Sequence, residues 1–309
     1  MDFRQLRIFK AVFDAGSIVG AADAERCAPS VVAHHLSNLE SSLKQVLFER
    51  SSRGVVPTAE GQQFHHHVVA ILRAVDNAET DMRDRTSVLT GRVVVGLAYS
   101  AVVGLGLPFM QRVMTEQPAL QLEIAESVSG ATIEHLFSTD IDIAVAYNPP
   151  RDPRLALTPL LEEEMLCLGK PELVGDVNQP MTMDEFLSKR FVLARRGPRG
   201  RPTANERDIQ KQLETRASLF SQNVAAATLF VNAGLGVILG TWANLRHGAF
   251  GPDIVGRPIA EAGITRTLFI CERSDTPSSG SMNYIRSTLL DCAADEISSG
   301  RWPGRTLMP

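Results

Sequence analysis

The chain has 309 residues, which exceeds the usual size of one hydrophobic core, so we expect a small folding unit and a larger one. Hydrophobic residues at 44% and charged residues at 21% are typical of soluble globular proteins, whereas 6% aromatic residues are too few for an aromatic-rich binding surface. The formal net charge of -4 excludes an overall attraction for nucleic acid, so any DNA binding must come from a local surface and from two copies placed on one duplex.

Cysteine usage and hydropathy indicate the compartment. The first residues, MDFRQLRIFK, lack the uninterrupted apolar run of a signal peptide, and no stretch approaches the roughly 20 apolar residues that span a bilayer. We therefore expect a cytoplasmic protein with no membrane contact. Its cysteines are scattered without paired metal-ligand spacing, which favours buried inert thiols over a redox pair, a disulfide scaffold or a metal site. They are Cys27, Cys167, Cys271 and Cys292.

The first residues predict three short helices. Residues 3–15 carry apolar side chains at spacings of three and four, which predicts an amphipathic helix that ends at Gly16. Ser17 suits the start of a second helix over residues 18–25, and Pro29 suits the first turn of a third. The buried stripe of the third helix is expected at Val32, Leu36, Leu39 and Leu43. Three helices in such close succession are typical of a helix-turn-helix.

The segment VLFERSSRGVVPT, residues 46–58, predicts a small β-hairpin, or wing, because two apolar runs flank a polar turn. Arg50 and Arg53 lie at its tip, where we expect them to neutralise DNA phosphates. The side chains that the third helix would present to the major groove are Ser30, Val31, His34 and His35. A solvated turn beside an ordinary helix remains the alternative for each feature taken alone.

One long helix is predicted over residues 58–90, starting at Thr58. Its apolar or small residues recur at spacings that alternate between four and three, interrupted only at Arg85, and they are Phe64, Val68, Ile71, Val75, Ala78, Met82 and Leu89. This heptad pattern favours pairing with a second copy, as a dimer or tetramer, over packing on its own domain. His65, His66 and His67 point about 100 degrees apart on a helix and cannot converge on one metal ion, so we expect them on the solvent side.

Two stretches, MDFRQLRIFKAVFDAGSIVGAA and LSNLESSLKQVLFERSSRGVVPTAEG, resemble the N-terminal signature of LysR-type transcriptional regulators in order and spacing. RGVVPTAEG, together with Ala28, is similar in particular to regulators of the nitrogen assimilation control type. The resemblance implies a winged helix-turn-helix that binds double-stranded DNA, a dimerising linker helix, an effector-sensing domain and RNA polymerase as a partner.

The sequence departs from the family at positions that read bases. Glu25 stands where a leucine is usual, and Ala28, Pro29 and Ser30 replace a Ser-Gln-Pro-like run, so a base-reading glutamine is missing. His34 and His35 replace the more usual arginine, lysine or glutamine. The general DNA-binding mode of the family therefore carries over better than any single base contact.

After Gly91, short apolar strands alternate with helices, which predicts α/β units with mostly parallel sheets. The expected strands are residues 92–98, 120–127, 140–147, 162–169, 190–195, 216–222, 236–241, 253–259 and 265–273. The resemblance to the LysR family implies that this region has a two-lobed fold like that of periplasmic binding proteins. The chain would cross between the lobes twice, and we expect these crossings near Glu163 and Thr267. Lobe one would then hold residues 92–162 and 267–300, and lobe two residues 163–266.

The predicted fold class is thus an α/β multidomain protein. Residues 1–57 form the winged helix-turn-helix, residues 58–90 the linker helix and residues 91–309 the two-lobed sensor domain. Ligands of open parallel sheets bind beyond the carboxyl ends of the strands, so a small polar or anionic effector is expected between the lobes. The candidate effector-binding residues are Ser100, Ser129, Thr132, Tyr147, Arg199 and Gln222.

Two of these candidates also rest on the resemblance. Ser100 and Ser129 match positions where relatives present Ser or Thr to an effector, and ordinary helix capping is the alternative. Arg199 belongs to the basic segment RRGPRGRPT, which would suit a carboxylate effector and equally suits a basic surface loop.

No catalytic motif is present. Gly234, Gly236 and Gly240 follow a predicted helix and precede a strand, the reverse of a dinucleotide fingerprint, and their stretch resembles the AGLGV turn of LysR-type sensor domains. Because no nucleophile elbow, Walker loop or paired carboxylate motif is found, we expect no enzyme, catalytic residue or cofactor. The alternatives are a two-lobed solute-binding protein or enzyme with an accessory helical domain, and a LysR-type regulator that needs no effector.

Overall fold

The structure is a computed structural model that describes residues 1–51, 54–83, 89–127, 129–194, 204–221, 223–247, 250–260, 265–276 and 279–308. The chain divides into two compact units, a small N-terminal one and a larger one that begins at Val88. Each unit has its own hydrophobic core.

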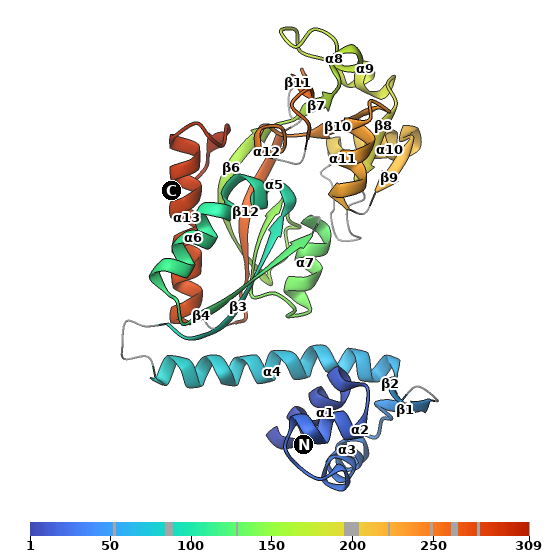
Figure 1. Cartoon of the computed structure of the whole chain (residues 1–309), viewed down its shortest axis with the longest axis vertical. Coiled ribbons are helices and arrows are strands. Elements are labelled where there is room, and N and C mark those ends of the chain that lie inside the picture. The colour runs from blue at the N-terminus through green and yellow to red at the C-terminus, as the bar shows by residue number, and fades with distance from the viewer. Residues whose placement is uncertain are drawn as a thin grey trace. The chain divides into compact units, whose positions relative to one another are not determined.

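The N-terminal unit is a helix-turn-helix followed by a hairpin and a long helix (Figure 1). Its elements are α1 (Phe3–Ala15), α2 (Ile18–Ala24), α3 (Pro29–Leu43), β1 (Phe48–Ser51), β2 (Gly54–Pro57) and α4 (Ala59–Arg83). Local signals set the boundaries: the side chain of Asp2 accepts from the Gln5 N–H at 2.8 Å to start α1, and Gly16 ends it with a φ of 60°. Ser17 caps α2, and Pro29 is the first residue of α3. The predicted winged helix-turn-helix is confirmed.

Aromatic side chains pack at the centre of the core of this unit. The fully buried ring of Phe9 lies 5.1 Å from that of Phe48 and 4.9 Å from that of Phe64, so one residue of α1 contacts both the hairpin and α4. Val68 of α4 is fully buried in the same cluster. The first half of α4 therefore belongs to the core of the winged domain.

The hairpin is shorter than predicted. It pairs Phe48 with Pro57 through Ser51 with Gly54, while Val46 stays outside the strand and 59% exposed. The backbone N–H of Leu47 instead donates to Glu40 Oε1 at 2.8 Å. At the entrance of the hairpin, the N–H of Leu47 thus bonds a half-buried carboxylate of α3, while its carbonyl oxygen accepts from the Thr58 N–H at 3.0 Å.

The heptad pattern also extends beyond the described helix. α4 is described as far as Arg83, whereas Leu89 has coil backbone and its N–H donates to Gln117 Oε1 at 3.0 Å. Val68 and Leu72 are buried within their own unit, and Ile71 is 37% exposed. The alternative of a helix packed on its own domain therefore holds for the first half of α4.

The larger unit contains two sheets. The first has strand order β13-β6-β12-β5-β3-β4 and consists of β3 (Gly91–Ala98), β4 (Leu120–Ser127), β5 (Ile143–Tyr147), β6 (Leu155–Glu164), β12 (Thr265–Arg273) and β13 (Arg305–Thr306). Its helical segments are α5 (Tyr99–Ala101), the π-helical η1 (Val102–Gly106), α6 (Leu107–Glu116), α7 (Ser129–Phe137) and α13 (Gly280–Ser298). α6 and α13 cover one face of this sheet and α7 covers the other (Figure 1).

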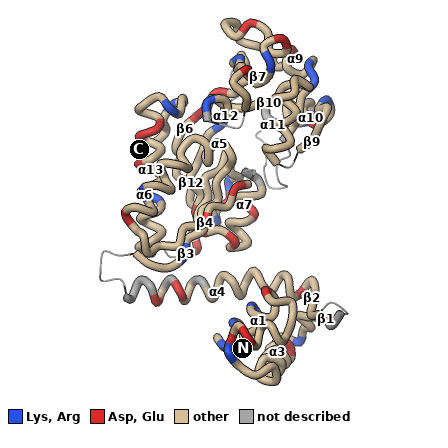
Figure 2. Tube along the Cα trace, viewed as in Figure 1, with Lys and Arg blue, Asp and Glu red and all other residues tan. Residues whose placement is uncertain are grey.

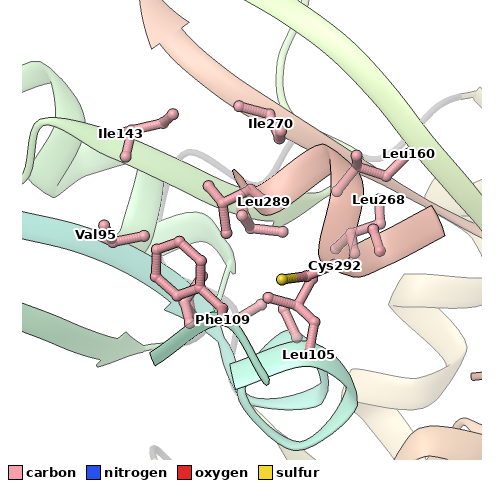
Figure 3. Packing of buried hydrophobic residues seen from close by; sticks show 14 of the residues in the cluster. Val95, Leu105, Phe109, Ile143, Leu160, Leu268, Ile270, Leu289 and Cys292 are labelled. Carbon is pink, nitrogen blue, oxygen red and sulfur yellow. The ribbon is translucent and has the colours of Figure 1, made fainter. Parts of the chain in front are cut away.

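Successive side chains of β3 point to opposite faces of the sheet and so contribute to both layers. Val95 packs with Phe109 of α6 and Leu289 of α13, and the sulfur of Cys292 points into the same cluster (Figure 3). Val94, one residue earlier, belongs to the opposite cluster beneath α7. A strand buried on both faces has a continuous apolar sequence, as this one does.

The second sheet has strand order β11-β7-β10-β8-β9. Its strands are β7 (Leu166–Gly169), β8 (Phe191–Ala194), β9 (Leu219–Ser221), β10 (Val237–Gly240) and β11 (Val255–Pro258). Its helices are α8 (Pro171–Val174), α9 (Met183–Leu187), α10 (Ala204–Arg216), α11 (Val224–Asn232) and α12 (Trp242–His247). Phe191 and Val192 lie in separate clusters, so this sheet is also covered on both faces.

Both sheets are mixed, so the prediction of mostly parallel sheets is wrong. In the first sheet, β3 is parallel to β4 and β5, but β12 is antiparallel to both β5 and β6. In the second sheet, β8 is parallel to β9 and β10, but β7 is antiparallel to β10 and β11. The antiparallel strands include those that carry the chain between the sheets, since β6 runs into β7 past Met165, and β12 follows β11. The single strand predicted over residues 162–169 is therefore two strands in different sheets.

Candidate functional site

The third helix of the N-terminal unit presents a polar face. Ser30 and His34 are exposed, and Val31 and His35 are half-buried, whereas Val32 faces the core. One turn beyond His34, the side-chain nitrogen of Asn38 lies 3.0 Å from His34 Nε2. Sequence reasoning missed Asn38, although its spacing of four from His34 was available as a signal.

His34 and Asn38 therefore form one exposed pair of hydrogen-bonding side chains. Asparagine and histidine both offer donors and acceptors, the chemistry that distinguishes base edges in a major groove. His35 is less accessible, because its Nδ1 is buried and meets no hydrogen-bond partner among the described residues.

Positive charge is not carried by α3 itself, which has neither lysine nor arginine and is almost free of blue in Figure 2. Arg26 and Lys44, both exposed, flank the helix on either side in the chain. The backbone of Arg50 pairs with Val55 in the hairpin, but its side chain and the whole of Arg53 lie outside the described residues. The assignment of phosphate contacts to the wing therefore stays a prediction.

In the larger unit, two predicted effector residues meet a residue that was not predicted. Ser100 of α5 and Tyr147 at the end of β5 are both buried, and a hydrogen bond joins their side chains. The Tyr147 hydroxyl donates to Glu163 Oε2 on β6. Glu163 is 1% exposed, and its other oxygen accepts from Trp302 Nε1 at 2.6 Å.

The second sheet reaches the same carboxylate. Thr241, which follows β10 and is fully buried, donates its hydroxyl to Asn244 Oδ1 at 3.3 Å. It also lies close enough to Glu163 to lower the pKa of that carboxyl. Arg266 pairs with Glu163 in the register of β12 and β6, and its guanidinium carbon lies 5.3 Å from the centre of the Tyr147 ring. Side chains from both sheets thus converge on Glu163.

Electrostatics fix which partners hold protons. Burial raises the pKa of Glu163, opposed by the hydrogen bonds from Tyr147 and Trp302, the charge of Arg266 and the nearby side chain of Thr241. Burial next to Glu163 raises the pKa of Tyr147 well above its ordinary value. Tyr147 therefore keeps its proton and acts as a donor.

The remaining predicted effector residues are not brought to this group by any described contact. Thr132 is buried in α7, with its hydroxyl 2.6 Å from that of Ser127. Ser129 is the first residue of α7, but its side chain lies outside the described part of the chain, as do Arg199 and Gln222. These assignments stay predictions. Sequence reasoning marked Glu163 only as an expected crossing between the lobes and not as a side chain of the site, and it did not mark Trp302 near the end of the chain.

The described residues contain no group of three or more His, Cys, Asp or Glu side chains that could hold a metal ion. No helix among them is long and apolar enough to cross a membrane.

Comparison with known families identifies the chain. A family model described as bacterial regulatory helix-turn-helix protein, lysR family, matches residues 3–62, and one described as LysR substrate binding domain matches residues 86–291. The chain belongs to the LysR family of transcriptional regulators. It is accordingly a DNA-binding regulator with an effector-binding domain, as predicted.

Relatives of this LysR-family regulator agree with that assignment. The nitrogen assimilation regulatory protein nac of Escherichia coli (strain K12) is 27% identical over 241 residues, 77% of this chain and 77% of that protein. This similarity confirms the resemblance to the nitrogen assimilation control type. The name of this relative describes a regulatory protein.

Two solved structures share the fold. A full-length OxyR variant from Pseudomonas aeruginosa has a TM-score of 0.69 at 19% identity, covering 95% of this chain and 94% of that one. Full-length CbnR complexed with its target DNA has a TM-score of 0.66 at 19% identity, covering 96% of this chain and 100% of that one. The predicted fold class of this LysR-family regulator is confirmed.

Proposed function

We propose that this LysR-family regulator binds promoter DNA as a homo-oligomer and that a small polar or anionic effector at the junction of the two lobes modulates this binding. Residues 1–57 bind DNA, residues 58–90 join two copies, and residues 91–309 sense the effector. The convergence of Ser100, Tyr147 and Thr241, from the ends of strands in two different sheets, is the observation that carries the sensing part. Because its target is DNA, we expect the protein in the cytoplasm, with RNA polymerase as a partner.

The DNA-binding part rests on α3 and the hairpin. In the proposed mode, Ser30, Val31, His34 and His35 face the major groove, and Arg50 and Arg53 of the hairpin contact phosphates. Because α3 has no positive side chain, affinity depends on such flanking arginines and on the second copy. The complex of CbnR with its target DNA shows that a protein of this fold binds DNA.

The oligomer rests on the second half of α4. Ile71 and Ala78 belong to the heptad pattern and are exposed in the single chain, whereas Val68 is already used by the winged domain. A second copy of α4 would cover the exposed members of the pattern. Two DNA-binding units held in this way fit two half-sites on one duplex.

The effector acts through the lobes. A ligand shifts a conformational equilibrium only by its different affinity for two arrangements, so it must contact residues of both sheets. In the proposed site, Ser100, Ser129, Thr132 and Tyr147 lie on the side of the first sheet and Arg199 and Gln222 on the side of the second. A regulator that needs no effector is the second candidate, because Glu163 already occupies the donors of Tyr147 and Trp302 beside Thr241 of the second sheet.

The DNA-binding part is tested by recovering the promoter fragments that the full-length protein binds and measuring their affinity over a range of salt. Arg53→Ala should weaken binding to every sequence and reduce the salt-dependence slope by about one unit. His35→Ala and His34→Ala should instead change the preference among sequences. An unchanged affinity and slope for Arg53→Ala would remove the wing from the interface.

The sensing part is tested by a thermal-shift screen of small polar metabolites, followed by footprinting of the promoter with and without each compound that binds. Ser100→Ala, which removes a buried hydroxyl without adding volume, should abolish the response to ligand while DNA binding persists. A ligand that alters the footprint of Ser100→Ala as it does that of the wild type would place the site elsewhere.

A further inference from the structure

Glu163 is a buried carboxylate that meets hydrogen-bond donors from separate parts of the chain. Trp302 Nε1 donates to one of its oxygens at 2.6 Å, and the Tyr147 hydroxyl donates to the other. Thr241 of the second sheet, whose hydroxyl donates to Asn244 Oδ1 at 3.3 Å, lies close enough to lower the pKa of Glu163. An indole N–H and a phenol hydroxyl are the kind of donors with which a pocket binds a free carboxylate.

The surroundings of these donors are closely packed. Trp302 is fully buried, and a Cβ atom at Gly104 would lie 2.8 Å from its ring, so the indole rests directly on the backbone of η1. Arg246 Nη1 of α12 donates to the carbonyl oxygen of Gly300 at 2.9 Å, just before Trp302. The indole donor is therefore held in place by contacts other than that with Glu163, as in a preformed ligand site.

We propose that Glu163 is an internal ligand, whose carboxylate fills a carboxylate-binding position at the junction of the two lobes and thereby excludes free carboxylates from the Ser100 and Tyr147 corner. The proposal rests on the proposed function, because it concerns the same site. It assigns Glu163 as the residue that determines which chemical class of effector this corner accepts.

Charge gives the reason for the exclusion. A second carboxylate beside Glu163 would meet a like charge in a buried environment, where the repulsion is weakly screened. Arg266 is the cation that faces Glu163 across the strand pair, and it balances one negative charge, not two. An effector that reaches Ser100 and Tyr147 therefore presents a neutral or donating group there, and any anionic group of it lies elsewhere.

Residues of both sheets surround Glu163 without a ligand. Tyr147 and Trp302 belong to the part built around the first sheet, and Thr241, which follows a strand of the second, lies beside the carboxylate. The internal carboxylate thus does for the lobes what a bound acid would do, and it stabilises one arrangement of them in the absence of any effector.

Chemical rescue tests the proposal on the full-length protein. Glu163→Ala removes a CH₂ and a carboxylate, the size of acetate, and leaves the donors of Trp302 and Tyr147 without their acceptor. Sodium acetate should raise the melting temperature of Glu163→Ala by about 2–4 °C at roughly ten times its dissociation constant, relative to sodium chloride of equal ionic strength. The wild type and Glu164→Ala, which changes the exposed neighbour on the same strand, should show no such shift.

Two outcomes would overturn the proposal: an acetate shift in the wild type equal to that in Glu163→Ala, or no shift in a Glu163→Ala protein that circular dichroism shows to be folded. Neither outcome bears on the promoter fragments, so failure here is distinguishable from failure of the proposed function.

A second variant decides the case if Glu163→Ala does not fold. Glu163→Gln keeps the volume but removes the charge, so the indole N–H resonance of Trp302 should move upfield as its acceptor weakens. Trp242, the second of the 2 tryptophans, is the internal reference and should not move. A Trp302 resonance that is the same in Glu163→Gln and in the wild type would show that the charge of Glu163 does not hold the indole and would overturn the assignment.

Discussion

The imidazole of His65 on α4 stacks on the phenyl ring of Phe13 on α1, with ring centroids 3.8 Å apart and planes 12° from parallel. The His65 side chain is only 18% exposed, and its Nε2 lies 4.0 Å from Asp14 Oδ1. The expectation that all three consecutive histidines face solvent is therefore wrong for His65, although His66 and His67 are exposed. The first half of α4 packs on α1, and this packing largely buries the side chain of His65.

The stability of the winged domain should fall as the pH decreases below about 6.5. Burial lowers the pKa of His65 from 6.5, partly opposed by Asp14, so below that value the unfolded chain binds the proton more readily than the folded one. The stabilisation is complete above the unfolded pKa and is lost as the pH falls through the folded pKa. Hydrogen exchange of α1 peptides, corrected for intrinsic rates, should show less protection at about pH 5.5 than at about pH 7.5.

His65→Phe keeps the ring contact and removes the titration, so it should flatten this pH dependence. His67→Gln, an exposed neighbour on the same helix, is the control and should behave like the wild type. An equally steep loss of protection in His65→Phe would assign the effect to another group.

Two substitutions on α4 should separate folding from self-association. Ile71→Glu places a charge on an exposed position of the heptad pattern, so it should shift light-scattering masses toward the monomer while the winged domain stays folded. Val68→Glu buries an unpaired charge against Phe9 and should destabilise the domain itself by at least about 3 kcal/mol. A wild type that is monomeric at micromolar concentration would contradict the oligomer.

Gly104→Ala should destabilise the larger unit by about 1–3 kcal/mol, because the added methyl group would lie 2.8 Å from the Trp302 ring. Thermal unfolding followed by tryptophan emission measures both the loss of stability and the displaced indole. Gly106→Ala is the matched control in the same π-helical segment, where the nearest atom would lie at 3.6 Å. Equal losses for both variants would indicate a backbone effect of glycine and not contact with Trp302.

Native-state alkylation should modify Cys27 first. Cys167, Cys271 and Cys292 are buried, and burial raises the pKa of Cys167 to about 12 and raises those of Cys271 and Cys292. Cys27 is half-buried in the winged domain. Mass spectrometry after brief iodoacetamide treatment should find one labelled site, and fast labelling of Cys292 in native protein would contradict the packing shown in Figure 3.

Local signals made much of the fold predictable. The helix of residues 3–15 and the strand of residues 265–273 were predicted with the bounds that the structure has, because caps and alternation act between near neighbours. The first half of β6 was missed, since Pro159 weakens the strand signal. Pro159 is tolerated where the register of β6 and β12 shifts, a feature that only the paired strand reveals.

The candidate site was predictable only in part, for a similar reason. Ser100, Tyr147 and Thr241 stand at strand ends, and the chain order alone marks such positions. The role of Glu163 could not be found in this way, because its hydrogen-bond donor Trp302 is 139 positions away and neither residue belongs to a motif.

The sequence by itself determined the order of the domains, the family and the class of chemistry, because periodicity, caps and a contiguous signature are local properties. Only the tertiary structure decided which face of α4 remains free and which polar group lies between the lobes. Val68 is buried in the same core cluster as Phe9, and one of three successive glutamates is buried against an indole and a phenol hydroxyl. Burial and hydrogen-bond partners are set by segments that meet only when the chain has folded.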